Sequence, residues 1–292
     1  MGNENRLSSI KVILFDMDGT LYQEDTFLNR YIRYMLEDTD REHETEAAIG
    51  IGRAILSDSH PFRFGHFYHA QDDNVLVGQE DGFVHGLTWE GESVAGLNPG
   101  APSPDLIHIG DPWCIAAVLA RKYKLPEEKL RLAFERVRKE MIAEPYRFAY
   151  RSDLFQAIEA LDAVDRKIVM TNTYLESGIE FLEYMGISHI FDGVFCGAEK
   201  PLGIERLFKA LLQEGYRSHE ILSIGDNPWN DLHPVKRLGG MTCFISPYES
   251  ADPEPWNWRL TTLDELKKLL QDIQTNKTRR EFSDGEDRAQ AY

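Results

Sequence analysis

The sequence predicts an α/β fold: a doubly wound parallel sheet with a second, mixed α/β domain inserted into it. Three features indicate this: apolar strand-like runs, helical patterns that alternate with them, and one long interval between the first run and the second. The runs are short and nearly continuous, as in strands buried on both faces of a parallel sheet. They are KVILFD (11–16), KIVMTN (167–172), IFDGVFC (190–196), EILSIGD (220–226) and MTCFIS (241–246).

Helical patterns separate the last four runs. In YLESGIEFLEYMG the spacing places four apolar side chains on one face, namely Leu175, Ile179, Leu182 and Met185. Gly186 follows where a helix would end, and GIERLFKALLQEG repeats the design with Gly215 as its stop. The stretch 152–162 predicts a further helix that leads into the second run. Alternating strands and helices imply right-handed crossovers and therefore an open doubly wound sheet.

The interval between the first and second runs is about 150 residues long, too long for a bare loop in a compact domain. Aromatic residues, valines and glycine-containing turns between 60 and 97 predict β-hairpins, and helical patterns cover about 22–38, 111–123 and 126–143. We therefore expect a core domain formed by 1–21 and 148–275, and an inserted domain at 22–147. The charged tail, 276–292, is expected to be disordered.

Composition limits the partners. The net charge of −17 and the pI of about 5.0 disfavour nucleic acid and anionic membranes, so we expect neither. An anionic small substrate would then need a locally positive pocket with a metal ion. The three cysteines are far apart, and no apolar stretch has the length of a membrane span or a signal-peptide core. The expected location is the cytoplasm, and the oligomeric state is left open.

Asp16 and Asp18 end the first predicted strand. Residues two apart in a strand point the same way, and doubly wound sheets bind ligands at the carboxyl ends of their strands. Two like charges this close need compensation, and a divalent cation is the obvious one.

Other polar residues follow the other predicted strands. They are Thr171, Asn172, Lys200, Asp226 and Asp231. Because the strand ends of one parallel sheet lie along one edge, we expect these side chains to converge with Asp16 and Asp18. Mg²⁺ prefers oxygen ligands, and lysine and threonine are natural phosphate partners, so the sequence predicts a Mg²⁺ and phosphate site.

In order along the chain, these residues resemble the four motifs of the haloacid dehalogenase-like (HAD) hydrolases of the phosphatase type. DMDGTL resembles the first motif, Thr171 in VMTNT the second, Lys200 in EKP the third and GDNPWNDL the fourth. The resemblance covers about 1–21 and 148–250, but not the sequence of the inserted domain. It implies a Rossmann-like HAD core, a phosphoric monoester hydrolase, and an inserted cap that excludes water from the substrate.

The resemblance also implies roles for the aspartates. Asp16 would be the nucleophile that forms an aspartyl phosphate, and Asp18 the general acid/base. Mg²⁺ would be held by the Asp16 carboxylate, the Asp18 backbone carbonyl and the Asp226 carboxylate, with Asp231 beside the metal. Dehalogenase and phosphonatase relatives lack an aspartate at the position of Asp18, which therefore points to phosphate esters or to phosphoryl transfer between sugars.

The remaining motif residues would contact the phosphoryl group. Thr171 and the backbone N–H of Asn172 would hold its oxygens, and Lys200 would offset negative charge. One departure concerns Lys200: in many relatives an acidic or polar stretch follows the lysine and proline, whereas here Leu202 and Gly203 follow.

Several alternatives stay open at this stage. The preferred function is a Mg²⁺-dependent phosphatase for a small soluble phosphate monoester; the same residues would serve a phosphomutase, and a non-catalytic phosphometabolite-binding protein could share the fold. The inserted domain also holds four histidines close to Asp72 and Asp73, namely His60, His66, His69 and His85. They could bind zinc, contact substrate or simply pack.

Overall fold

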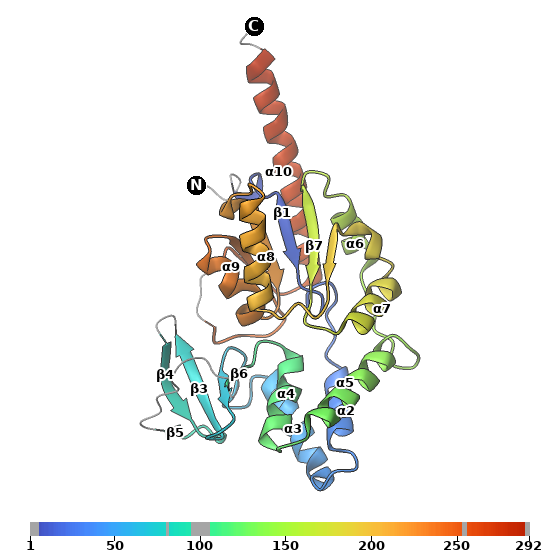
Figure 1. Ribbon diagram of the computed structural model, residues 1–292, viewed down its shortest axis with the longest axis vertical. Coiled ribbons are helices and arrows are strands. Elements are labelled where there is room, and N and C mark those ends of the chain that lie inside the picture. Colours follow the sequence, from blue (N-terminus) through green and yellow to red (C-terminus); the bar gives the residue numbers. More distant parts are fainter. Residues whose placement is uncertain (1–5, 80–81, 95–105, 253–255, 290–292) are drawn as a thin grey trace. The chain divides into compact units, whose positions relative to one another are not determined.

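The computed structural model describes residues 6–79, 82–94, 106–252 and 256–289, and it divides the chain into two compact units (Figure 1). The core unit comprises Met1–Gln23, Ala149–Pro247 and Trp256–Tyr292. The inserted unit comprises Glu24–Phe148 and Tyr248–Pro255. Each unit contains its own sheet.

The core sheet has six strands in the order β11-β10-β9-β1-β7-β8, and every neighbouring pair is parallel. The strands are β1 (Val12–Phe15), β7 (Arg166–Met170), β8 (Gly193–Phe195), β9 (Ile221–Gly225), β10 (Met241–Ile245) and β11 (Trp258–Leu260). The first five confirm the predicted strands, and the predicted doubly wound class is confirmed with them. The edge strand β11 was not predicted, because three residues of WRL carry no strand periodicity.

The central strand β1 is buried throughout, because helices cover both faces of the sheet (Figure 1). On one face Val12 and Leu14 pack in a cluster with side chains of α8 and α9. Phe15 is in register with Val169 of β7 and with Ile224 of β9. The chain therefore leaves β1 between the carboxyl ends of two neighbouring strands, which is where Asp16 begins its loop.

Helices α6 to α9 of the core unit lie between strands in the chain, and α10 follows the last strand. They are α6 (Ser152–Glu159), α7 (Leu175–Met185), α8 (Leu202–Gln213), α9 (His233–Arg237) and α10 (Leu263–Ala289). Gly186 ends α7 in the left-handed conformation, with φ of 71°, and Gly215 follows α8 with φ of 105°. Both glycines stop their helices as predicted.

The predicted buried face of α7 was wrong in part. Leu175 and Ile179 are 64% and 41% exposed, whereas Phe181 lies in the core beside Leu182 and Met185. The reason is Gly178: a Cβ there would lie 2.4 Å from Sγ of Cys196, so the glycine face is the one that approaches the sheet closely. The spacing of apolar residues is compatible with either of two overlapping faces of α7, and it does not show which of them packs closely against the sheet.

The tail differs from its expected disorder over most of its length. Helix α10 continues through 276–289, and residues 290–292 lie outside the described part. The stretch contains no proline and is rich in charged residues with good helix propensity, which allows the helix begun at Leu263 to continue.

The inserted unit combines helices with an antiparallel sheet, in agreement with the predicted mixed α/β insertion. Its helices are α2 (Phe27–Leu36), α3 (Thr45–Leu56), α4 (Pro112–Lys122) and α5 (Glu127–Met141). Its strands follow the order β5-β4-β3-β2-β6, with β2 (Phe67–His69), β3 (Asn74–Gln79), β4 (Gly82–Leu87), β5 (Ser93–Val94) and β6 (Leu106–His108).

Residues 248–252, which follow β10 in the chain, pack with the inserted unit. The N–H of Ala251 donates to the carbonyl of Phe64 over 2.8 Å, and Nε2 of His108 lies 3.3 Å from the Asp252 carboxylate. The chain therefore passes between the two units at four points, whereas the interval 148–275 was expected to belong wholly to the core.

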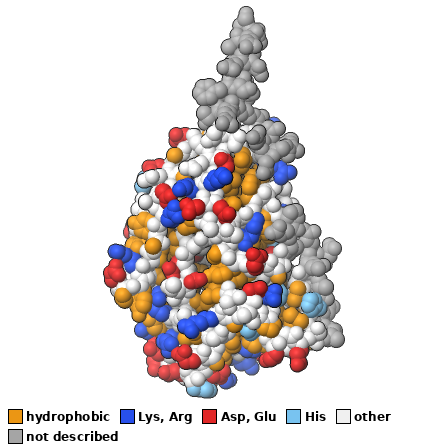
Figure 2. All heavy atoms as spheres, turned by 180° about the vertical axis from the view of Figure 1, so that it is seen from behind, with side chains coloured by type: hydrophobic (Ala, Val, Ile, Leu, Met, Phe, Trp, Pro, Cys, Tyr) orange, Lys and Arg blue, Asp and Glu red, His pale blue; other side chains and the backbone are white. Residues whose placement is uncertain are grey.

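Among the described helices, none is both long and apolar enough to cross a membrane. On the face drawn in Figure 2, acidic and basic side chains are interspersed with apolar ones.

Candidate active site

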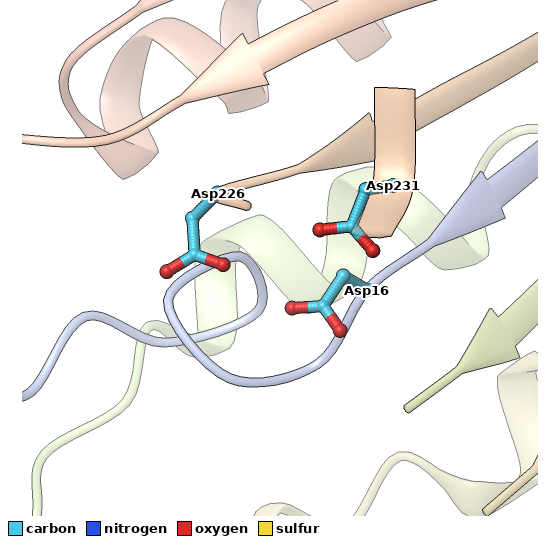
Figure 3. A group of neighbouring side chains, drawn as sticks. All are labelled: Asp16, Asp226 and Asp231. Carbon is cyan, nitrogen blue, oxygen red and sulfur yellow. The ribbon is translucent and has the colours of Figure 1, made fainter. Parts of the chain in front are cut away.

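Three carboxylates of the core unit converge beyond the carboxyl ends of β1 and β9. Asp16 follows β1, Asp226 follows β9, and Asp231 lies on the π-helical turn Pro228–Leu232 (Figure 3). All three are buried, and each offers an oxygen within 4.8 Å of the oxygens of the other two. They form the one such group of metal-binding residue types found within the described residues.

The carboxylates of Asp226 and Asp231 each occupy space that a side chain on a neighbouring glycine would fill. A Cβ on Gly19 would lie 1.9 Å from Oδ2 of Asp226, and one on Gly225 would lie 2.3 Å from Oδ2 of Asp231. Gly19 also has φ of 77°, a conformation that other residues rarely adopt. The glycine in DMDGTL is therefore required both by the turn and by the neighbouring carboxylate.

Lys200 joins two of the three carboxylates. Its Nζ lies 2.5 Å from Oδ1 of Asp16 and 2.6 Å from Oδ1 of Asp231, and all three side chains are buried. The unusual sequence after Lys200 has a packing reason: a Cβ on Gly203 would lie 1.6 Å from the carbonyl oxygen of Ala198. Gly203 thus lets the first turn of α8 pack against the loop that holds the lysine.

Burial dominates the electrostatics of this cluster. It raises the pKa of Asp16 to about 8, against the opposing effect of Lys200 and with further increases from the charges of Asp231 and Asp18. Burial alone would lower the pKa of Lys200, but Asp16 and Asp231 outweigh it and raise that pKa. The cluster therefore contains three buried carboxylates and one ammonium group, which is an imbalance of negative charge.

That imbalance fits a divalent cation. The donor atoms are carboxylate oxygens, which Mg²⁺ prefers, and an added double positive charge would stabilise the ionised forms that burial disfavours. Asp16, Asp226 and Asp231 are the residues whose side chains would hold it.

Asp18 has a different environment from Asp16. Its carboxylate accepts hydrogen bonds from hydroxyl groups: Thr173 at 2.9 Å, Thr171 at 3.4 Å, and Tyr22. Thr20 donates instead to Oδ2 of Asp16, at 3.4 Å.

The loop after β7 links this site to Lys200. The side chain of Asn172 accepts from the N–H of Lys200 at 2.7 Å and donates to the Lys200 carbonyl at 3.2 Å. Asn172 is otherwise exposed, whereas Thr171 is buried. The Asn172 side chain therefore positions the backbone at Lys200, a contact that the sequence did not predict.

All seven candidate residues lie in the core unit, in the loops that follow β1, β7, β8 and β9. Direct contacts join Lys200 to Asp16, Asp231 and Asn172, and join Asp18 to Thr171. Asp226 joins them through its proximity to Asp16 and Asp231. Sequence reasoning missed Tyr22 and Thr173; the available signal was a hydroxyl residue four positions after Asp18 and another two positions after Thr171.

The histidines of the inserted unit have separate partners. Nδ1 of His60 accepts from the N–H of Phe62, and Nδ1 of His69 lies 2.9 Å from Asp72. His66 is buried and its Nδ1 accepts from the backbone of Arg63, whereas His85 is exposed. Within the described residues these histidines form no three-residue metal cluster.

A family model described as haloacid dehalogenase-like hydrolase matches residues 10–239 of the chain. Comparison with curated proteins finds no match. Among solved structures, a predicted phosphoglycolate phosphatase from Haemophilus somnus 129PT is 16% identical, with a TM-score of 0.52, over 89% of this chain and 98% of that one. A protein from Clostridium difficile, provisionally assigned as a phosphatase, is 14% identical with a TM-score of 0.50 over the same shares. At these identities the two structures support the fold alone.

Proposed function

The chain belongs to the haloacid dehalogenase-like hydrolases, and from that premise we propose that it is a Mg²⁺-dependent phosphatase for small phosphate monoesters. The observation that carries the proposal is the buried cluster of Asp16, Asp226 and Asp231 with Lys200 at its edge. Phosphoryl transfer needs an in-line nucleophile and positive charge around the phosphoryl oxygens, with little other chemistry from the protein.

The proposed reaction has two steps. In the first, a carboxylate oxygen of Asp16 attacks phosphorus, the bond from phosphorus to the ester oxygen breaks, and Asp18 gives a proton to the departing alcohol. In the second, Asp18 takes a proton from water, whose oxygen attacks phosphorus while the bond to Asp16 breaks. The products are an alcohol and inorganic phosphate, and both aspartates return to their initial states. A covalent intermediate divides one difficult hydrolysis into two easier steps.

The other residues support these steps by charge and position. Lys200 contacts the nucleophile directly and offsets negative charge beside it. Thr171 and the backbone N–H of Asn172 are proposed to hold the phosphoryl oxygens. Bound Mg²⁺ would reduce the repulsion between the Asp16 carboxylate and the anionic ester.

The test is hydrolysis of 4-nitrophenyl phosphate with and without Mg²⁺. We expect turnover that EDTA removes, and loss of turnover in Asp16→Asn, while the exposed variant Asp162→Asn keeps wild-type activity. Full activity in Asp16→Asn would exclude it as the nucleophile. Product analysis with sugar phosphates separates the two enzyme types, because a phosphatase releases inorganic phosphate and a phosphomutase returns an isomerised sugar phosphate.

A further inference from the structure

Tyr22 and Thr173 lie on either side of the Asp18 carboxylate. The Tyr22 hydroxyl donates to Oδ1, and the Thr173 hydroxyl donates to Oδ2 at 2.9 Å. These contacts come from different segments, since Tyr22 lies in the loop after β1 and Thr173 in the loop after β7. Together they hold both oxygens of the carboxylate and so fix the plane of the group.

Both hydroxyls are held in place by their own surroundings. Tyr22 is 1% exposed, and its ring packs 5.9 Å from the ring of Phe181. Thr173 is buried; its N–H donates to Oγ1 of Thr171 and its carbonyl accepts from Gly197. The ring packing holds Tyr22, and the two backbone hydrogen bonds hold the main chain that carries the Thr173 hydroxyl.

The two aspartates of DMDGTL thus have different kinds of partner. Asp16 contacts the ammonium group of Lys200. Asp18 is contacted by the hydroxyls of Tyr22, Thr171 and Thr173, and a hydroxyl can rotate and serve as donor or acceptor. A hydroxyl pair can therefore keep the group oriented before and after it has passed on a proton.

We propose that Tyr22 and Thr173 are positioning residues that orient Asp18 for proton transfer to the leaving alcohol. This inference rests on the proposed function, in which Asp18 is the general acid. Nothing in it requires Tyr22 or Thr173 to touch the substrate. A positioned acid contributes most when the leaving group is a poor one, because a good leaving group departs without a proton.

The test compares kcat/KM for glycerol 2-phosphate, which has a poor leaving group, with kcat/KM for 4-nitrophenyl phosphate, which has a good one. kcat/KM includes the step in which the alcohol leaves. We expect Tyr22→Phe and Thr173→Val each to lower the value for glycerol 2-phosphate about tenfold and to change the value for 4-nitrophenyl phosphate much less. Thr173→Ser keeps the hydroxyl and should therefore keep the wild-type ratio of the two kcat/KM values, glycerol 2-phosphate over 4-nitrophenyl phosphate. Asp18→Asn removes the acid itself and should change this ratio the most.

Tyr68→Phe is the matched control, because Tyr68 is equally buried and its hydroxyl donates to Asp73 over 2.7 Å in the inserted unit. It removes the same kind of bond and should leave the ratio unchanged. An unchanged ratio in Tyr22→Phe and Thr173→Val, or an equal loss on both esters, would overturn the proposal. Absence of turnover by the wild-type protein would instead contradict the proposed function, so the two failures are distinguishable.

Discussion

The ammonium nitrogen of Lys200 lies 2.6 Å from Oδ1 of Asp231, and this contact joins the loop after β8 to the turn after β9. Because the same nitrogen also contacts Asp16, a single lysine links three of the loops at the carboxyl edge of the sheet. The second oxygen of Asp231 accepts from the N–H of Asn227 at 3.1 Å, so this carboxylate is held at both ends.

Lys200→Met should leave the three buried carboxylates without their cation. Breaking a buried ion pair in this way costs about 3–5 kcal/mol, and we expect a loss of that size in the free energy of unfolding of the metal-free protein. Urea denaturation in EDTA measures it. Lys209→Met is the control, because Lys209 forms an exposed pair with Glu205 on α8, and exposed ion pairs contribute little to stability. Equal small losses in both variants would show that Lys200 does not neutralise the cluster.

Gly19→Ala should abolish the stabilisation of the protein by Mg²⁺. The added Cβ would overlap Oδ2 of Asp226, so that carboxylate must move away from Asp16 and Asp231. Wild-type protein should gain about 2.7 kcal/mol at a Mg²⁺ concentration 100 times its Kd, seen as a rise in Tm. Gly186→Ala is the control, since Gly186 has a similar φ of 71° but no atom within 4 Å of its added Cβ. If Gly19→Ala kept the wild-type Mg²⁺ shift, Asp226 would not be a ligand.

His66 should make the inserted unit sensitive to mild acid. Burial, with help from the charge of Arg63, lowers the pKa of His66 from 6.5 to about 4. Because the unfolded state then binds a proton more tightly than the folded state, protonation of this histidine favours unfolding. Its contribution to the free energy of unfolding is fully present above pH 6.5 and is lost as the pH falls toward 4. Between pH 7 and pH 5 this amounts to about 2 kcal/mol in the free energy of unfolding.

Urea unfolding of His66→Gln at the two pH values measures that contribution. The variant should lose about 2 kcal/mol less than the wild-type protein over this interval. His189→Gln, which alters an exposed histidine of the core unit, should retain the wild-type dependence. An identical pH dependence in His66→Gln and wild type would contradict the prediction.

Gly65→Ala should loosen residues 248–252 from the inserted unit. A Cβ at this position would lie 2.4 Å from the N of Asp252 and 2.8 Å from Ala251, and φ is 91°. We expect a loss of about 1–3 kcal/mol together with faster hydrogen exchange at the Ala251 amide, which donates to Phe64. Gly50→Ala within α3 should instead stabilise by about 0.5–1 kcal/mol, because nothing lies within 4 Å of its added Cβ. Unchanged exchange at Ala251 in Gly65→Ala would count against this account.

Five of the six core strands could be predicted from the sequence because a strand buried on both faces leaves a short, continuous apolar run. The convergence of the candidate residues could be predicted from one rule of topology, that parallel strands present their carboxyl ends at one edge. The strand β11 could not be predicted, because its three residues are too few to show a periodic pattern. The buried face of α7 could not be predicted either, because the close approach of this helix to Cys196 depends on Gly178.

By itself the sequence determined the class of fold and the chemical types along one edge of the sheet, because periodicity and residue order are local properties of the chain. Only the tertiary structure decided that Lys200 bridges Asp16 and Asp231, that Asn172 holds the lysine backbone, and that Tyr22 and Thr173 both contact Asp18. Apart from Tyr22 and Asp18, which are four positions apart, these pairs combine segments that are distant in sequence. Their contacts depend on the register of neighbouring strands and on glycines that admit a neighbouring carboxylate. No spacing along the chain encodes such a distance.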